Sequence, residues 1–105
     1  MFVHERLIVL NEVYGHTYHK VAIRDQKSRW GSCSTKGNLN FNYRIQFLPP
    51  HLADYVIAHE LCHLKEFNHG SGFWDLVEKA IPEYRAHKEE LQKIQIRRGV
   101  LVSMG

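Results

Sequence analysis

The 105-residue sequence predicts an α+β domain in which a small β-sheet packs on a central, mostly apolar helix, with further helices toward the C-terminus. Three observations predict this class: two short strand patterns in the first half of the chain, an apolar helix pattern after Pro49-Pro50, and two amphipathic helix patterns beyond it. Because hydrophobic residues make up 44% and charged residues 24% of a chain of this length, we expect a single domain over residues 1–105.

Helix, strand and turn patterns alternate before residue 38. Apolar spacing over residues 3–14 predicts a one-faced helix, and Gly15 stands where a left-handed residue would end it. The apolar positions of that helix are Val3, Leu7, Leu10, Val13 and Tyr14. Residues 20–24 predict a short strand, residues 28–33 a turn-rich segment, and Lys36-Gly37 a hairpin turn.

A second strand pattern over residues 38–45 has the clearest period of two in the chain. One face carries Asn38, Asn40, Asn42 and Arg44, and the other carries Leu39, Phe41, Tyr43 and Ile45. The polar face has two interpretations: the solvated side of a half-buried strand, or the rim of a cleft that holds an extended substrate. In the second, the candidate substrate or oxyanion contacts are Asn40, Asn42, Tyr43, Arg44 and Arg29.

Pro50 is well placed to be the first residue of a helix that we expect over residues 51–66. Apolar residues cover most of its circumference, and only a narrow stripe around Asp54 and Lys65 suits bulk water. A helix of this kind belongs in the interior of a domain, so we expect the other elements to pack around it.

Two further helices are expected after a glycine-containing loop. Ser71 is the predicted N-cap of the first, whose apolar face includes Phe73, Val77 and Ala80. Pro82 starts the second, over residues 83–98, and Gly99 ends it. Its inward positions are Tyr84, Leu91 and Ile94, and the last residues of the chain resemble a tail.

His59, Glu60 and His63 form the helical pattern His-Glu-x-x-His. A four-residue step advances a helix by about 400°, so the two imidazoles emerge one turn apart on the same side and can bind one divalent cation. Glu60 lies about 100° around the helix from His59, where it can reach a metal-activated water without binding the metal. Burying histidine and glutamate side chains in an apolar helix is costly unless a partner compensates them, and a bound cation is such a partner. The alternative is a set of hydrogen-bonded core histidines.

A catalytic zinc site needs three protein ligands and an open position for water. His69 is the candidate for the third ligand, and Glu78 on the next helix is the alternative. On a continued helix His69 would point about 240° away from His63, so the chain must leave the helix after Lys65 and double back. The glycines in residues 68–72 permit this turn. A purely structural metal site is disfavoured because such sites normally have four protein ligands.

Three sequence blocks carry a resemblance to a known family. They are Lys27-Ser28-Arg29-Trp30-Gly31-Ser32-Cys33, then Gly37-Asn38-Leu39-Asn40, and then His59-Glu60-Leu61-Cys62-His63 followed by Asn68-His69 and Phe73-Trp74. Over nearly all of residues 1–85 the chain resembles the YgjP-like family of zinc metallopeptidase-type hydrolases, which is related to SprT-like domains. The resemblance implies a zincin-like α+β fold with His59, His63 and His69 as zinc ligands and Glu60 as the catalytic base.

The sequence departs from related patterns at two points. It lacks the N-terminal extension usual in the family, so we expect a short form of the domain. Its ligand spacing equals that of the metzincins, but Glu66 replaces their glycine, and Met1 and Met104, the only two methionines, leave no Met-turn. We therefore exclude the metzincin class.

The expected function is zinc-dependent peptide hydrolysis, in which Glu60 takes a proton from the attacking water. Manganese, nickel and cobalt are the alternative metals. One alternative function is a nucleotide triphosphate pyrophosphatase that uses the same site, with which Arg29 and Arg44 are compatible. The other is a DNA-associated protease module like the SprT-like proteins. It ranks lower because the net charge of +3 is spread along the chain, without a basic stripe rich in stacking side chains.

No apolar run approaches the roughly 18–20 residues that a membrane span requires. The N-terminus lacks the apolar core of a secretory signal. The two cysteines, Cys33 and Cys62, do not indicate a disulfide framework, so we expect reduced thiols and a cytoplasmic protein. Cys62 points away from His63 on the helix and is expected to pack in the core rather than bind metal. Trp30 is interpreted as a core anchor, with stacking on a substrate as the alternative.

Overall fold

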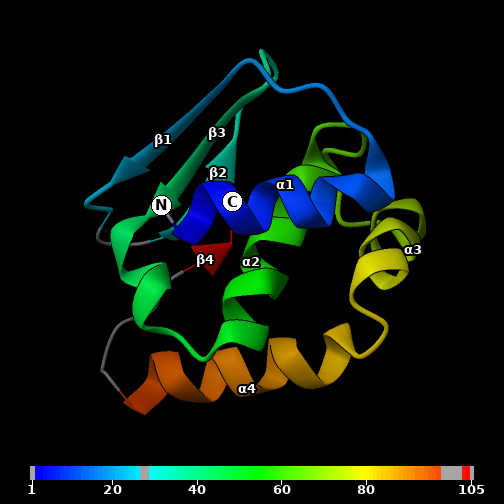
Figure 1. Cartoon of the computed structure of the whole chain (residues 1–105). Coiled ribbons are helices and arrows are strands. Elements are labelled where there is room, and N and C mark those ends of the chain that lie inside the picture. Colours follow the sequence, from blue (N-terminus) through cyan, green and yellow to red (C-terminus); the bar gives the residue numbers. More distant parts are fainter. Residues whose placement is uncertain (1, 27–28, 98–102, 105) are drawn as a thin grey trace.

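The computed structural model describes residues 2–26, 29–97 and 103–104 and confirms the α+β class (Figure 1). Its helices are α1 (Phe2–Tyr14), α2 (Pro50–His63), α3 (Ser71–Ala80) and α4 (Tyr84–Arg97), with a short 3₁₀ helix, η1 (Tyr43–Phe47). Its strands are β1 (Lys20–Arg24), β2 (Arg29–Cys33), β3 (Asn38–Asn42) and β4 (Ser103–Met104). Within this part of the chain, no helix combines the length and apolar character needed to cross a bilayer.

The strands form one mixed sheet in the order β1-β3-β2-β4. β1 runs parallel to β3, and β3 runs antiparallel to β2 through the hairpin turn predicted at Lys36-Gly37, where Gly37 has a φ of 82°. The prediction of a turn-rich segment over residues 28–33 is wrong, because Arg29–Cys33 is strand β2. The ladder with β3 offers its backbone hydrogen-bond partners and so overrides the local turn preference of glycine and serine. The expected tail likewise includes β4, which pairs in parallel with β2.

The second predicted strand ends at Asn42 rather than at residue 45. The Asn42 carboxamide oxygen accepts a hydrogen bond from the backbone N–H of Arg44 and caps η1. The strand alternation stops there, since Tyr43 is 36% exposed while Ile45 is fully buried. A side chain that satisfies a helix N-terminus therefore sets the end of this strand.

Helix α2 contacts most other elements of the domain: α1, α3, α4, η1, β2 and β3 (Figure 1). Every residue from Tyr55 to His63 is buried, as the apolar pattern predicts. Pro50 lies in its first turn, as expected, but the helix ends at His63 rather than at residue 66. The backbone N–H groups of Lys65 and Glu66 both donate to the Cys62 carbonyl, which closes the last turn and releases the chain.

The remaining helices cover the core with the faces that the sequence predicts, except at one residue of α1, and one predicted helix cap is wrong. Val13 of α1 is 51% exposed, although it was placed on the apolar face. The N-cap of α3 is Gly70, without a side-chain hydrogen bond, so the prediction of Ser71 as the cap is wrong. Gly15 has the expected left-handed conformation, with a φ of 63°. The predicted stop at Gly99 lies outside the described residues.

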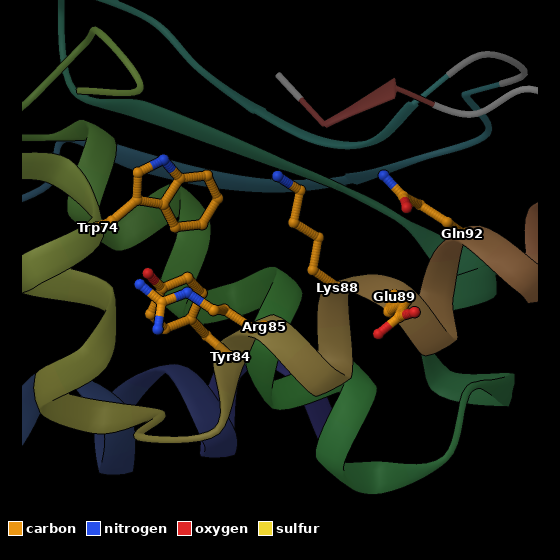
Figure 2. A pocket seen from close by; sticks show the side chains of 6 residues that line it. All are labelled: Trp74, Tyr84, Arg85, Lys88, Glu89 and Gln92. Carbon is orange, nitrogen blue, oxygen red and sulfur yellow. The ribbon is translucent and has the colours of Figure 1, made fainter. Parts of the chain in front are cut away.

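A pocket of about 450 Å³ lies beside the start of α3 and along α4 (Figure 2). Its lining residues are Trp74, Tyr84, Arg85, Lys88, Glu89 and Gln92. The sequence patterns predict the inward position of Tyr84 but not the pocket, because its shape depends on how two separate helices meet.

Strand β2 approaches α2 so closely at Gly31 that a side chain there would have no room. A Cβ atom at Gly31 would lie 3.0 Å from the Glu60 Cγ and 3.1 Å from the Asn40 carbonyl oxygen. We therefore expect Gly31→Ala to lower the free energy of unfolding by about 1–3 kcal/mol, measured by chemical denaturation.

The matched control is Gly70→Ala, since no atom lies within 4 Å of a Cβ at Gly70. Its cost should stay below about 1 kcal/mol, the difference between glycine and alanine at an N-cap. Equal stability of the Gly31→Ala variant and the wild type would contradict the close approach.

Candidate metal centre

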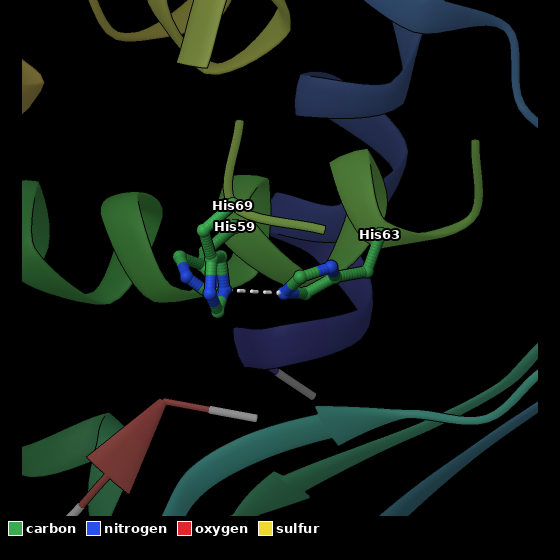
Figure 3. Close-up of side chains that lie close together, drawn as sticks. All are labelled: His59, His63 and His69. Carbon is green, nitrogen blue, oxygen red and sulfur yellow. Dashed lines mark hydrogen bonds between the residues drawn. The ribbon is translucent and has the colours of Figure 1, made fainter. Parts of the chain in front are cut away.

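Three imidazoles converge where α2 ends and the following loop returns (Figure 3). His59 and His63 lie one turn apart on α2 and are only 2% and 3% exposed, while His69 belongs to the loop before α3 and is more exposed. One ligand atom from each ring lies within 4.8 Å of the others. The expectation that the chain leaves the helix and doubles back to bring His69 to the pair is confirmed.

Two aromatic rings from the first turn of α3 hold this loop in place. The centre of the Phe73 ring lies 4.9, 4.5 and 5.0 Å from those of His59, His63 and His69, respectively. Trp74 stacks on His69 at 6.0 Å and an interplanar angle of 29°. These contacts restrict the direction in which His69 points.

The hydrogen bonds of the paired histidines set their tautomers. The Nδ1 of His63 lies 3.0 Å from the Glu66 carbonyl oxygen, which can only accept, so Nδ1 carries the hydrogen and Nε2 keeps its lone pair. The Nδ1 of His59 lies 3.2 Å from the Oε2 of Glu60, which accepts its hydrogen when the carboxyl group is ionised. Carbonyl and carboxylate partners of this kind are typical of histidines that bind metal through the other nitrogen.

The nitrogen atoms are spaced for a shared cation. The Nε2 atoms of His63 and His69 are 2.9 Å apart, as in a hydrogen bond between one protonated and one bare nitrogen. Two zinc–nitrogen bonds of about 2.0–2.1 Å in tetrahedral geometry would hold such atoms about 3.4 Å apart. A small movement of one ring therefore converts the observed contact into a metal-binding pair.

Burial favours the neutral form of all three imidazoles. Desolvation lowers the pKa of His59 to about 3, with smaller electrostatic contributions from His69 and Lys88. Desolvation also lowers the pKa of His63 and that of His69, and the Lys88 ammonium adds to the effect on His69. Neutral imidazole is the form that binds transition metals.

Glu60 lies beside the histidines and is completely buried. Its Oε1 has no hydrogen-bond partner among the described residues, and its Oε2 faces His59. Burial raises the pKa of the carboxyl group to about 8, against the opposing effects of His63 and Arg29. A buried carboxylate oxygen without a partner is costly, so a polar ligand or a cation at this point would relieve the cost. Three imidazole nitrogen donors fit a divalent metal of the zinc type, and the Glu60 oxygen lies beside them without being part of the donor set.

Of the five predicted substrate contacts, Arg29 is the one whose charge acts on Glu60. It begins β2, the strand that packs against α2. Asn40 lies on the face of β3 opposite the buried Leu39, and its carboxamide oxygen accepts a hydrogen bond from Arg24. That face points away from the core side of the sheet on which α2 packs.

The other three predicted contacts lie around the end of β3. Asn42 is 2% exposed and donates to the backbone carbonyls of Gln26 and Arg29. The guanidinium of Arg44 donates to Asp25 and lies 4.6 Å from the centre of the Tyr43 ring. The structure thus gives Asn42 and Arg44 partners within the protein, and the substrate roles of all five residues stay predictions.

The alternatives from the sequence are placed as follows. Glu78 is exposed and is not part of the histidine cluster. Cys62 is a free, fully buried thiol in the hydrophobic core, as its packing interpretation requires, and Cys33 is a free thiol on β2. Trp30 is 3% exposed and belongs to the same core, which supports its role as an anchor.

Two features near the cluster were not predicted. One is the close approach of β2 at Gly31, which brings that strand against Glu60. The other is Lys88 of α4, whose charge reaches His59 and His69. Lys88 follows Tyr84 by one helical turn, so the inward position of Tyr84 was the signal that could have placed both on one face.

Comparison with known proteins places this geometry in a family. The profile of YgjP-like metallopeptidase domains matches residues 1–94. The metallopeptidase zymogen abylysin of Pyrococcus abyssi is 28% identical, with a TM-score of 0.79, over 96% of this chain and 99% of that one.

The metallopeptidase zymogen jannalysin of Methanocaldococcus jannaschii is 29% identical, with a TM-score of 0.62, over 89% of this chain and 90% of that one. Comparison with curated proteins finds no match. The family match covers strands β1 to β3, the central helix and the histidine cluster together. The chain therefore belongs to the YgjP-like family of metallopeptidase domains.

Proposed function

We propose that the protein is a zinc-dependent peptidase in which His59, His63 and His69 bind the metal and Glu60 is the general base. The observation that carries the proposal is one cluster that combines three neutral imidazoles within 4.8 Å and a buried carboxylate oxygen without a partner. Three protein ligands leave one coordination position open, as catalytic rather than structural zinc sites do.

The protein residues supply the proton transfers of peptide hydrolysis. A zinc ion at this site would polarise the scissile carbonyl and lower the pKa of a coordinated water from 15.7 toward about 7. The Oε1 of Glu60 has no competing partner, so it is free to accept the proton of the attacking water and to return it to the leaving amine. Contact with Gly31 and His59 holds the carboxylate in one orientation, which favours transfer at a fixed position.

Peptide is the substrate class that the family match favours over nucleotide. An extended peptide can bind by pairing with the edge of a sheet, and β2 is the strand nearest to Glu60. We also propose a cytoplasmic location, which the free thiols of Cys33 and Cys62 support.

A second proposal is that the chain is latent until its C-terminal strand is displaced. β4 pairs with β2, and Ser103 and Met104 lie opposite Arg29 and Gly31, so β4 occupies the sheet edge that a substrate would use. The two similar solved structures are both described as zymogens. Latency here would come from competition between β4 and the peptide for the same backbone groups.

Zinc binding should stabilise the folded state. At a zinc concentration 100 times the Kd, we expect about 2.7 kcal/mol of added stability, seen as a rise in Tm that a chelator reverses. His69→Ala should lose most of this rise, because the site would keep only two ligands. His4→Ala, at an exposed histidine far from the cluster in sequence, is the control and should keep it. A Tm that zinc does not change would contradict the metal site.

Glu60→Gln should retain zinc and lose hydrolysis. We expect a decrease in kcat of about 10²–10⁴-fold, the usual contribution of a general base. The assay uses casein and, separately, nucleoside triphosphates with the zinc-loaded protein. The peptidase is supported if Glu60→Gln abolishes casein cleavage and only that activity. Triphosphate hydrolysis that depends on Glu60 would support the pyrophosphatase instead. Activity that the substitution leaves unchanged would exclude both.

Removal of the β4 pairing should activate the chain. We expect Ser103→Pro, which deletes a backbone donor from the strand, and a chain that ends at Arg97 to cleave casein about tenfold faster than the full chain. The factor corresponds to the loss of one or two backbone hydrogen bonds from the latent form. A synthetic peptide of residues 98–105 should inhibit the shortened chain. Equal rates for all three proteins, with unchanged Tm, would contradict latency through β4.

A further inference from the structure

We infer that the pocket between α3 and α4 is the subsite for a carboxylate group of the peptide substrate, with Lys88 as its ionic partner and Trp74 as its apolar wall. The inference rests on the proposed peptidase function, because a substrate subsite presupposes a peptide substrate. The pocket residues do not belong to the three-histidine cluster, so binding at the pocket can be tested separately from hydrolysis.

The pocket adjoins the histidine cluster because Trp74 borders both. The centre of the Trp74 ring lies 6.0 Å from those of His59 and His69. The Nζ of Lys88 lies 4.8 Å from the centre of the same ring, and Tyr84 stacks on it at 5.0 Å and 13°. Since an extended peptide advances about 3.3–3.6 Å per residue, a side chain in the pocket belongs to a residue next to, or one removed from, the scissile bond.

The pocket presents a cation that has no anionic partner among the residues that the structure describes. Among the described residues, neither Lys88 nor Arg85 forms a salt bridge, and the Arg85 guanidinium lies over the Tyr84 ring at 5.2 Å. Glu89 is the one carboxylate in the lining, and Figure 2 shows it turned away from the Lys88 ammonium. In the same view, the side chains of Lys88 and Gln92 project together from α4. The free charge in the pocket is therefore positive.

The composition of the lining selects a single carboxylate. The rings of Trp74 and Tyr84 offer an apolar surface for the methylene groups of an acidic side chain, and Gln92 adds an amide donor. The contact with Trp74 restricts the long Lys88 side chain, which lowers the entropy lost when it forms an ion pair. The two cations of the lining, Lys88 and Arg85, against the one carboxylate, Glu89, leave a net charge that suits one negative group better than the several charges of a triphosphate, and it repels basic side chains.

The carboxylate can come from an acidic side chain or from the C-terminus of the substrate. The test is an NMR titration of the full chain with three blocked tripeptides: acetyl-Ala-Glu-Ala-amide, its glutamine analogue, and acetyl-Ala-Ala-Ala with a free carboxylate. The indole N–H of Trp74 reports on the pocket. Trp30, the only other tryptophan, is buried in the core and serves as the internal control.

We expect the glutamate peptide, the free-carboxylate peptide, or both to shift the Trp74 resonance and to bind about three- to tenfold more tightly than the glutamine peptide. Whichever of the two binds more tightly identifies the source of the carboxylate. Lys88→Gln should abolish the preference, and Lys88→Glu should reverse it in favour of the corresponding lysine peptide. Lys79→Gln, at an exposed lysine of α3 outside the pocket, should change nothing.

Equal binding of the glutamate, free-carboxylate and glutamine peptides would overturn the inference, as would a preference that survives Lys88→Gln. Binding of a nucleoside triphosphate at Trp74 without binding of the carboxylate peptides would also overturn it. The titration needs neither metal nor turnover. If carboxylates bind but no peptide is hydrolysed, the pocket assignment stands and the proposed function is wrong. If peptide is hydrolysed but carboxylates are not preferred, the proposed function stands and the pocket assignment is wrong.

Discussion

The structure depends on the burial of three ionisable side chains in the last turns of an otherwise apolar helix. His59, Glu60 and His63 are each no more than 3% exposed. Removing such groups from water is costly unless partners compensate them, and the hydrogen bonds in the protein satisfy only part of their capacity. The chain thus holds a chemically incomplete cluster in its most enclosed position, and the cation of the proposed function is a partner that would complete it.

The remaining elements can be understood as means of keeping that cluster rigid and dry. Strand β2 comes within van der Waals contact of Glu60 because residue 31 is glycine, and Phe73 lies within about 5 Å of all three imidazole rings. Fixed donors in a partly enclosed site interact more strongly with a charge than flexible ones in solvent do. This explains why a chain of 105 residues places so much of its core around one helix end.

The sequence predicted the features that depend on local spacing. The apolar surround of α2, the alignment of His59 with His63 and the return of His69 all follow from helical geometry and a glycine-containing loop. It failed where a distant partner decides the outcome. Strand β2 exists because a hairpin pairs it with β3. The early end of β3 has a local cause that a period-two pattern does not detect, because Asn42 caps η1. The position of Lys88 beside the cluster depends on the packing of α4, which no local pattern contains.

The two walls of the site offer different kinds of recognition. In the proposed function the edge of β2 would present backbone groups, with which any extended peptide can pair, so it would contribute affinity with little preference for sequence. Side chains must therefore supply the selectivity, and those that adjoin the cluster on the opposite wall come from α3 and α4, at Trp74 and Lys88. Because β4 also pairs through its backbone, it can occupy the β2 edge whatever its side chains are. A substrate with a carboxylate that reaches Lys88 gains an interaction that backbone pairing lacks. This additional interaction favours displacement of β4 by the substrate.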